Sequence, residues 1–189
     1  MKFRLLSVLV LTTVVFAMNS CKKDDPVEPV IENEEEVITT LNFTLTPDGG
    51  GDAVVFSFQD LDGDGGNAAV IENGILAANS TYTGALELLN ETESPAEDIT
   101  EEVEEEAEEH QFFFETTLTA MAVAYADTDA DGNPIGLATT VTTGDAEMGT
   151  LTITLRHEPV KDGVGVSDGD ITNAGGETDI EVTFDVDVQ

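Results

Sequence analysis

Cysteine, tryptophan and basic residues are scarce in this sequence of 189 residues. The single cysteine, Cys21, excludes an intramolecular disulfide and any metal site built from several thiolates. Six Lys and Arg residues against 40 Asp and Glu give a formal charge of −34, which repels nucleic acid and anionic membrane surfaces. Trp is absent and the only tyrosines are Tyr82 and Tyr125, so an aromatic platform for stacking sugars is poorly supplied.

The sequence also lacks the patterns of common catalytic centres. It contains no Gly-x-Ser-x-Gly nucleophile elbow and no Gly-rich phosphate loop. A pair of carboxylates for hydrolysis can always be found among 40 acidic residues, so such a pair says little by itself. We therefore predict no catalytic residue and a non-enzymatic protein, with a carboxylate-dependent hydrolase as an alternative.

The first 20 residues have the layout of an export signal. Lys2 and Arg4 precede an uncharged, mostly apolar stretch over residues 5–17, which is short for a membrane span and has the length of a signal-peptide core. The next residues, Met18-Asn19-Ser20-Cys21, resemble the lipobox of bacterial lipoproteins. The resemblance implies cleavage before Cys21 and lipidation of its sulfur; an ordinary signal peptide with a chance cysteine is the alternative.

Residues 21–36 are predicted to form an acidic, Pro- and Glu-rich tether. It begins with Lys22, Lys23, Asp24 and Asp25, which resemble the surface-export signal of Bacteroidetes lipoproteins. The resemblance implies an outer-membrane lipoprotein that faces the medium, and a periplasm-facing protein is the alternative. With four basic and 40 acidic residues, the mature chain would carry a formal charge of −36.

Apolar and polar residues alternate through most of residues 37–189. The clearest case is the C-terminal strand, whose apolar positions are Ile180, Val182, Phe184, Val186 and Val188. Further strands are predicted at residues 41–45, 54–58, 82–89, 118–126, 135–143 and 150–155. Strands with one wet face, separated by Gly- and Asp-rich turns, predict one mainly β domain: an antiparallel, two-sheet, Ig-like β-sandwich. A small barrel is the alternative.

One segment has a helical pattern. Ser94-Pro95-Ala96-Glu97 has the form of a capping box with proline at the first helical position, which predicts a helix over residues 95–109. Ile99, Val103 and Ala107 give this helix a single apolar stripe. Its many glutamates repel one another at i,i+4 spacing, so the helix needs packing or cations to hold. The aromatic run at residues 112–114 is expected to return the chain to the core.

Two acidic loops resemble the first half of a calcium loop. Alternate carboxylates followed by glycine occur twice in the chain, at Asp60, Asp62 and Asp64 and at Asp127, Asp129 and Asp131. Neither loop has glutamate at its twelfth position, so these are not EF-hands. They predict weak binding of Ca²⁺, and the competing interpretation is that Asp and Gly simply form turns in an acidic protein.

His110 and His157 are the only histidines. A transition-metal site needs further ligands, and the sequence contains no His-x-His motif or Cys cluster. His110 follows the acidic helix and His157 follows Arg156, so we predict structural roles for both.

Several blocks of the mature chain resemble a group of small flavobacterial envelope lipoproteins without an established activity. They lie at residues 90–103, 109–114, 131–137, 155–159 and 170–180. Members of this group are sometimes assigned a type 1 periplasmic-binding fold, whose two α/β lobes need a longer and more helical chain than this one. The resemblance implies an envelope lipoprotein and carries over no catalytic residue.

Taken together, these features predict a lipid-anchored, non-enzymatic binding or structural accessory module that Ca²⁺ stabilises. The lipid anchor attaches the protein to the membrane. The sequence does not identify the protein or glycan that the module binds. A solute- or glycan-binding accessory protein of an uptake system is the first alternative, and it requires a concave aromatic or polar pocket.

Overall fold

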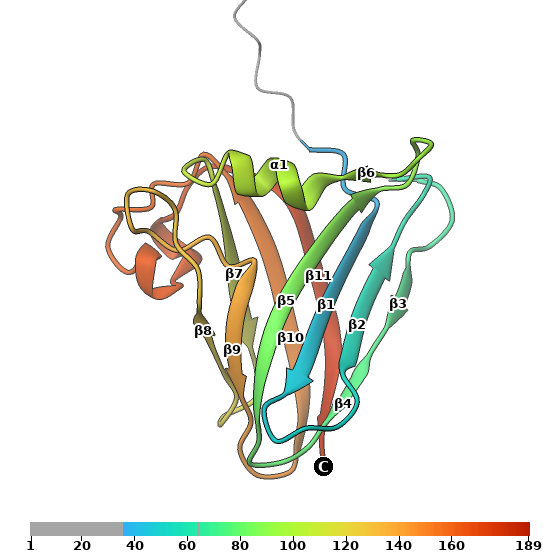
Figure 1. Ribbon diagram of the computed structural model, residues 1–189, viewed down its shortest axis with the longest axis vertical. Coiled ribbons are helices and arrows are strands. Elements are labelled where there is room, and N and C mark those ends of the chain that lie inside the picture. Colours follow the sequence, from blue (N-terminus) through green and yellow to red (C-terminus); the bar gives the residue numbers. More distant parts are fainter. Residues whose placement is uncertain (1–35, 64) are drawn as a thin grey trace, which may run out of the picture. The chain divides into compact units, whose positions relative to one another are not determined.

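The computed structural model describes residues 36–63 and 65–189 (Figure 1). The predicted signal peptide, the lipidation site Cys21, the export signal at residues 22–25 and Asp64 lie outside the described residues. Residues 35–189 group into a compact unit. Within the described part of the chain, no helix has the length and apolar character needed to cross a membrane.

The domain is mainly β and is built from two sheets with one short helix, as predicted. The first sheet contains, in spatial order, β3 (Val70–Glu72), β2 (Val54–Gln59), β1 (Thr40–Pro47), β5 (Thr81–Asn90), β9 (Ala138–Thr142) and β8 (Ala122–Tyr125), with β6 (Glu97–Asp98) paired to β5. The second contains β4 (Gly74–Leu76), β11 (Glu177–Val188), β10 (Glu147–His157) and β7 (His110–Thr116). Neighbouring strands run antiparallel except β4 and β11, which are parallel and make the second sheet mixed.

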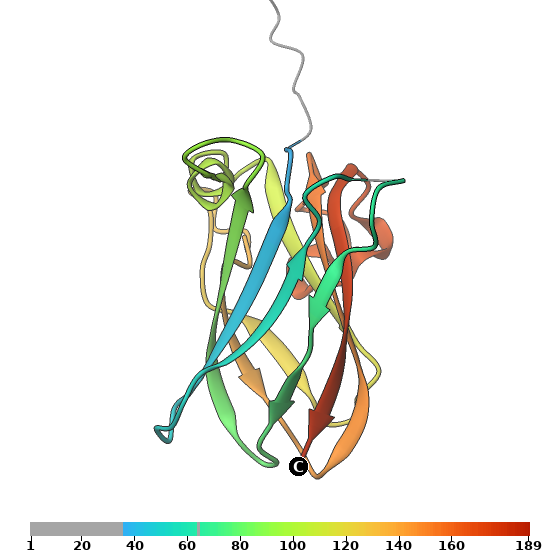
Figure 2. The same cartoon turned by 90° about the vertical axis from the view of Figure 1, so that its right-hand side faces the viewer.

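The core lies between the two sheets, whose layers are visible in Figure 2. The predicted alternation is clearest on β11, where Ile180, Val182, Phe184, Val186 and Val188 are buried between polar residues, and apolar residues also alternate into the core on β1 and over residues 151–155 of β10. Phe56 of the first sheet and Phe184 of the second meet edge to face with ring centroids 5.6 Å apart. Burying a large apolar side chain stabilises the fold by about 1.5–3 kcal/mol, so this layer of contacts dominates the stability.

The helix α1 (Ile99–Glu105) is shorter than the predicted span of residues 95–109 and begins at a different cap. Asp98, not Ser94, is the N-cap, and its carboxylate accepts a hydrogen bond from the Thr100 amide. The expected capping box does not form because Glu97 and Asp98 pair with β5 as β6. Ile99 and Val103 are buried as predicted, and the helix ends where glutamates crowd its C-terminus.

The aromatic run after the helix returns to the core, as expected, and is buried on both faces of β7. Phe112 joins the core between the sheets, while Phe113 packs on the outer side against Val166 and Ala174. Those two residues belong to the segment 158–176, which contains two short 3₁₀ helices, η1 (Val166–Asp168) and η2 (Ile171–Asn173). Gln111 fastens this segment to β7 by donating a hydrogen bond to the Val166 carbonyl at 2.9 Å.

Candidate functional site

A buried cluster of two histidines and an aspartate joins three neighbouring strands of the second sheet. His110 begins β7, His157 ends β10, and Asp179 lies in β11. His110 and His157 are directly opposite in the antiparallel register, and their rings stack with centroids 4.7 Å apart. We call His110, His157 and Asp179 the His–Asp cluster.

An irregularity in the sheet brings Asp179 to this cluster. The register of β10 and β11 shifts at Leu155 and Arg156: Ile180 faces Leu155 and Thr178 faces Arg156, so the pairing passes over Asp179. A bulge of this kind re-aims a side chain that strict alternation would turn to solvent. The Asp179 side chain is accordingly fully buried.

The carboxylate of Asp179 spans both rings. One oxygen lies 3.8 Å from His110 Nε2 and the other lies 3.8 Å from His157 Nδ1. On its other side, His157 Nε2 is 3.9 Å from the half-exposed carboxylate of Glu109. The potential ligand atoms of the His–Asp cluster all lie within 4.8 Å of one another.

The protonation of His110 follows from its surroundings. Its Nδ1 lies 3.2 Å from the Glu106 carbonyl oxygen, which can only accept, so Nδ1 carries the proton. Nε2 is then a bare lone pair, and it is buried without a hydrogen bond to any described residue. Burial lowers the pKa of His110, against an opposing contribution from the Glu106 hydrogen bond, so the ring is neutral at neutral pH.

Glutamates extend this cluster toward the surface. Carboxylate oxygens of half-buried Glu36 and exposed Glu106 lie within 4.8 Å of each other and of a His110 ring nitrogen. The pKa of Glu36 is raised to about 7 by burial, by a side-chain hydrogen bond with Glu102, and by repulsion from Glu102, Glu106 and Asp179. At neutral pH the Glu36 carboxyl is therefore about half protonated beside the buried neutral imidazole.

The second Asp-rich loop is organised around an internal cation, Lys161. Its ammonium group donates to Asp129 Oδ2 at 2.9 Å, to the Ala107 carbonyl at 2.5 Å and to the Pro134 carbonyl at 3.2 Å. Both side chains of the Lys161–Asp129 pair are almost completely buried. Burial alone would raise the pKa of Asp129, but hydrogen bonds from Lys161 and from the backbone lower it overall.

The remaining oxygens of this loop also have protein partners. Asp129 Oδ1 accepts from the Asn133 amide at 2.8 Å, and the two oxygens of Asp127 accept from the Gly136 and Ala138 amides at 2.8 and 2.7 Å. Asp131 is exposed. The carboxylates that the sequence assigned to calcium thus hold the loop together here, and Lys161 sits beside Asp129 where a metal cation was expected.

The first Asp-rich loop is similarly closed by its own hydrogen bonds. Asp60 Oδ1 accepts from the Gly63 amide at 2.9 Å, and the Asp62 carboxylate accepts from the backbone and side chain of Asn67. Those hydrogen bonds from Asn67 lower the pKa of Asp62. Within residues 36–63 and 65–189, neither loop gathers three carboxylates at mutual ligand distance. Calcium binding stays a prediction.

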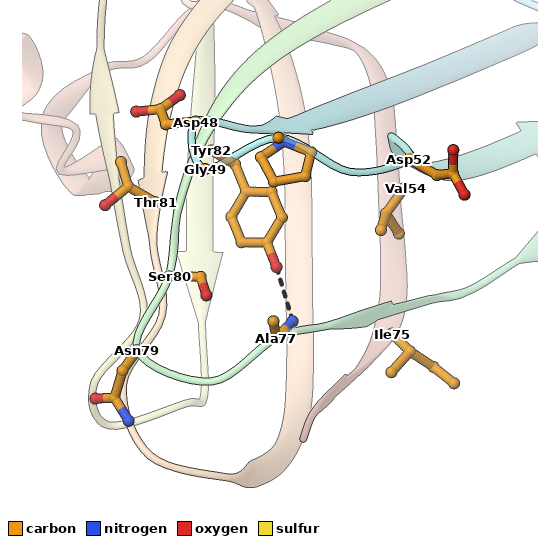
Figure 3. Close-up of a pocket in the computed structure, with 12 residues that line it drawn as sticks. Asp48, Gly49, Asp52, Val54, Ile75, Ala77, Asn79, Ser80, Thr81 and Tyr82 are labelled. Carbon is orange, nitrogen blue, oxygen red and sulfur yellow. Dashed lines mark hydrogen bonds between the residues drawn. The ribbon is translucent and has the colours of Figure 1, made fainter.

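An open pocket of about 710 Å³ lies at the far end of β1, between the β1–β2 turn and the β4–β5 turn (Figure 3). Its polar lining includes Asp48, Asp52, Asn79 and Ser80. Tyr82 is 98 % buried and accepts a hydrogen bond from the Ala77 amide at 2.7 Å, so it forms a wall and offers no face for stacking a sugar.

Sequence reasoning found the acidic loops but missed the His–Asp cluster and Lys161. The two histidines are far apart in the chain, and Asp179 sits in a strand whose alternation predicts an outward side chain. The sequence signal available for the His–Asp cluster is that each histidine is next to an acidic residue, Glu109 or Glu158.

Comparisons with protein-family models, curated proteins and solved structures found no match to this chain.

Proposed function

We propose that this chain is a lipid-anchored lipoprotein of the bacterial outer membrane that acts as a non-enzymatic binding or structural accessory module. The lipid on Cys21 anchors it, residues 22–25 direct it to the cell surface, and residues 21–36 separate the domain from the bilayer. The domain at residues 37–189 binds a partner protein or glycan.

The observation that carries this proposal is that the pocket lies at the end of β1 opposite to the one where the chain enters the domain. The chain enters the domain at Glu36, beside α1, and β1 then runs the length of the sheet to Pro47 at the pocket (Figure 1). The seven residue-to-residue steps from Thr40 to Pro47, at a rise of about 3.3 Å each, place the two ends of β1 roughly 23 Å apart. The pocket is therefore away from the end of the domain that the proposed tether joins.

The two sheets support an Ig-like β-sandwich over a closed barrel. In the described part of the chain the sheets have separate hydrogen-bonded orders and meet through apolar side chains such as Phe56 and Phe184. A barrel would join them through continuous strand pairing. The parallel pairing of β4 with β11 is the departure from the antiparallel arrangement that the sequence predicted.

The polar pocket favours the solute- or glycan-binding accessory as second candidate, because its concave surface is lined by carboxylates, amides and hydroxyls. For the hydrolase alternative, Glu36 and Glu102 form an acid pair in which the pKa of Glu36 is raised to about 7. These two carboxyl groups share a hydrogen bond, whereas glycosidase carboxylates stand about 5 Å or more apart to admit the sugar. We therefore retain the non-enzymatic module.

Cell fractionation tests this proposal. The unaltered chain is expected in the outer-membrane fraction and open to protease added to intact cells. Cys21→Ser should release it from that fraction, while Met148→Ser, at an 80 % exposed side chain of β10, should not. Replacing residues 22–25 with alanine should keep the protein in the membrane but protect it from protease. A Cys21→Ser protein that fractionates like the parent contradicts the proposal.

A further inference from the structure

The His–Asp cluster has the donor chemistry of a transition-metal site. Two imidazoles and one carboxylate converge from the neighbouring strands β7, β10 and β11. Imidazole nitrogen together with carboxylate oxygen suits zinc and related transition metals, whereas calcium and magnesium prefer oxygen donors alone. This cluster therefore differs in kind from the two Asp-rich loops.

The fold already orients His110 as a metal ligand. The hydrogen bond from Nδ1 to the Glu106 carbonyl fixes the tautomer, which is the usual outer-shell support of a ligating histidine. Nε2, on a side chain with no exposure, lies 3.8 Å from Asp179 Oδ2 and makes no hydrogen bond to a described residue. A lone pair and a carboxylate oxygen repel each other, and a cation bound to both turns that repulsion into attraction.

The spacing of the donor atoms fits one small ion. Zinc binds imidazole nitrogen and carboxylate oxygen at about 2.0–2.2 Å, so neighbouring ligands of a tetrahedral ion stand about 3.4 Å apart. One oxygen of Asp179 lies 3.8 Å from His110 Nε2 and the other lies 3.8 Å from His157 Nδ1. Because the two rings stack at 21°, binding one ion requires at least one imidazole to turn so that both lone pairs point at it.

Two features of the surrounding structure favour a cation here. The bulge in β11 gives up regular pairing to bury Asp179 against the two rings, and bulges are frequent beside functional sites. Glu36 and Glu106 place carboxyl oxygens within 4.8 Å of a His110 ring nitrogen, so oxygen donors lie between the surface and the cluster.

We propose that His110, His157 and Asp179 form a binding site for one divalent transition-metal ion of the zinc class. The three ligands leave a fourth tetrahedral position for water. The ion clamps the ends of β7, β10 and β11 together, so it binds the folded chain and stabilises it. This site is separate from the lipid anchor and from the pocket, and its existence does not depend on the proposed function.

Zinc binding to the purified, untagged protein tests the proposal. A Cys21→Ser background removes the only thiol, and the absence of a tag leaves His110 and His157 as the only histidines. Isothermal titration and elemental analysis after ultrafiltration should give one tightly bound Zn²⁺ per chain, with a rise in Tm. CaCl₂ in excess should not displace it.

Variants locate the ion. His110→Gln and His157→Gln should each weaken Zn²⁺ binding by at least ~100-fold, since losing even an outer-shell partner costs roughly 10–100-fold. Asp60→Asn, in the first Asp-rich loop, is the acidic control and should bind as the parent does. Circular dichroism without metal confirms that each variant is folded. Folded histidine variants that bind Zn²⁺ as tightly as the parent would overturn the proposal.

If the histidine variants do not fold, ¹⁵N NMR of the His110 and His157 imidazoles in the protein that retains both histidines tests the same proposal. Two histidines give two sets of imidazole ¹⁵N signals in the Cys21→Ser protein. One equivalent of Zn²⁺ should shift His110 Nε2 and His157 Nδ1 and leave the Nδ1 proton of His110 in place. Ring signals that do not move at saturating Zn²⁺ would show that the ion, if bound, sits on surface carboxylates, and the proposal would be wrong.

Discussion

At the scale of single residues, Lys161 joins parts of the chain that lie far apart in the sequence. Its three hydrogen bonds reach Ala107 after α1, Pro134 in the second Asp-rich loop, and Asp129. An ammonium group has three protons to donate, so all of them are used inside the protein. Lys161 thus links its own segment to two others, at Ala107 and at residues 129–134.

Replacing Lys161 with methionine should be strongly destabilising. The change keeps most of the apolar stem but leaves the Asp129 carboxylate buried without its cation, which costs about 3–5 kcal/mol of unfolding free energy. Urea unfolding of Lys161→Met against the parent measures this loss. Val160→Ala, at a 54 % exposed neighbour, is the control and should change stability by less than ~0.5 kcal/mol. A Lys161→Met variant as stable as its control would show that the pair contributes little.

The same pair makes a pH prediction. The pKa of Asp129 in the folded chain lies below its ordinary value of 3.8, so its ionised form stabilises the fold above about pH 4 and this contribution is lost as pH falls through the folded pKa. Asp129→Asn removes that dependence. The difference in unfolding free energy between parent and Asp129→Asn should therefore be largest at neutral pH and shrink below about pH 4. A difference that stays constant down to pH 3 contradicts the assignment.

Sequence reasoning was weakest at this scale. The acidic pattern at Asp127 and Asp129 predicted calcium binding, and it gave no sign that Lys161, some 30 residues later, lies beside Asp129. The histidines were given structural roles because no local pattern connects them to each other or to Asp179. Such sites form when strands align, and only the register of the sheet shows which residues meet.

At the scale of elements, the long strands were predictable because each keeps one face in the core. Residues 41–45, 151–155 and 180–188 alternate without interruption, so period two identifies both the strand and its buried side. Strands of two or three residues, such as β3 and β6, are too short to show a period. The helix start was misplaced because Asp98 offers a second cap four residues after Ser94.

The cap of α1 gives a prediction for this element. Asp98→Ala removes the acceptor for the Thr100 amide and should lower the unfolding free energy by about 1 kcal/mol, as loss of an N-cap side chain usually does. Glu104→Ala, which removes an exposed glutamate from the same helix without touching the cap, is the control. If the two variants have equal unfolding free energies in urea, Asp98 is not the stabilising N-cap of α1 and the prediction is wrong.

At the scale of the whole molecule, negative charge dominates. A formal charge of −34 crowds the surface with like charges, whose repulsion weakens as salt shortens the screening length from about 30 Å at 0.01 M to about 8 Å at 0.15 M. NaCl over this range should therefore raise Tm. A chain whose Tm does not respond to NaCl would show that its charges are too far apart to repel.

Calcium can be separated from screening in the same experiment. CaCl₂ at matched ionic strength should add stability beyond NaCl if either Asp-rich loop binds the ion, by preferential binding to the folded state. We expect any such gain to be lost in Asp60→Asn and Asp62→Asn, because Asp129 is already held by Lys161. Equal curves for the two salts contradict the calcium prediction.

The central claim is that this domain is held at the membrane by lipid on Cys21, and mass spectrometry of the N-terminal peptide of the mature protein tests it most directly. We predict a peptide that begins at Cys21 and carries a diacylglyceryl group on its sulfur. A mature chain that begins at any other residue, or an unmodified Cys21, would contradict the account.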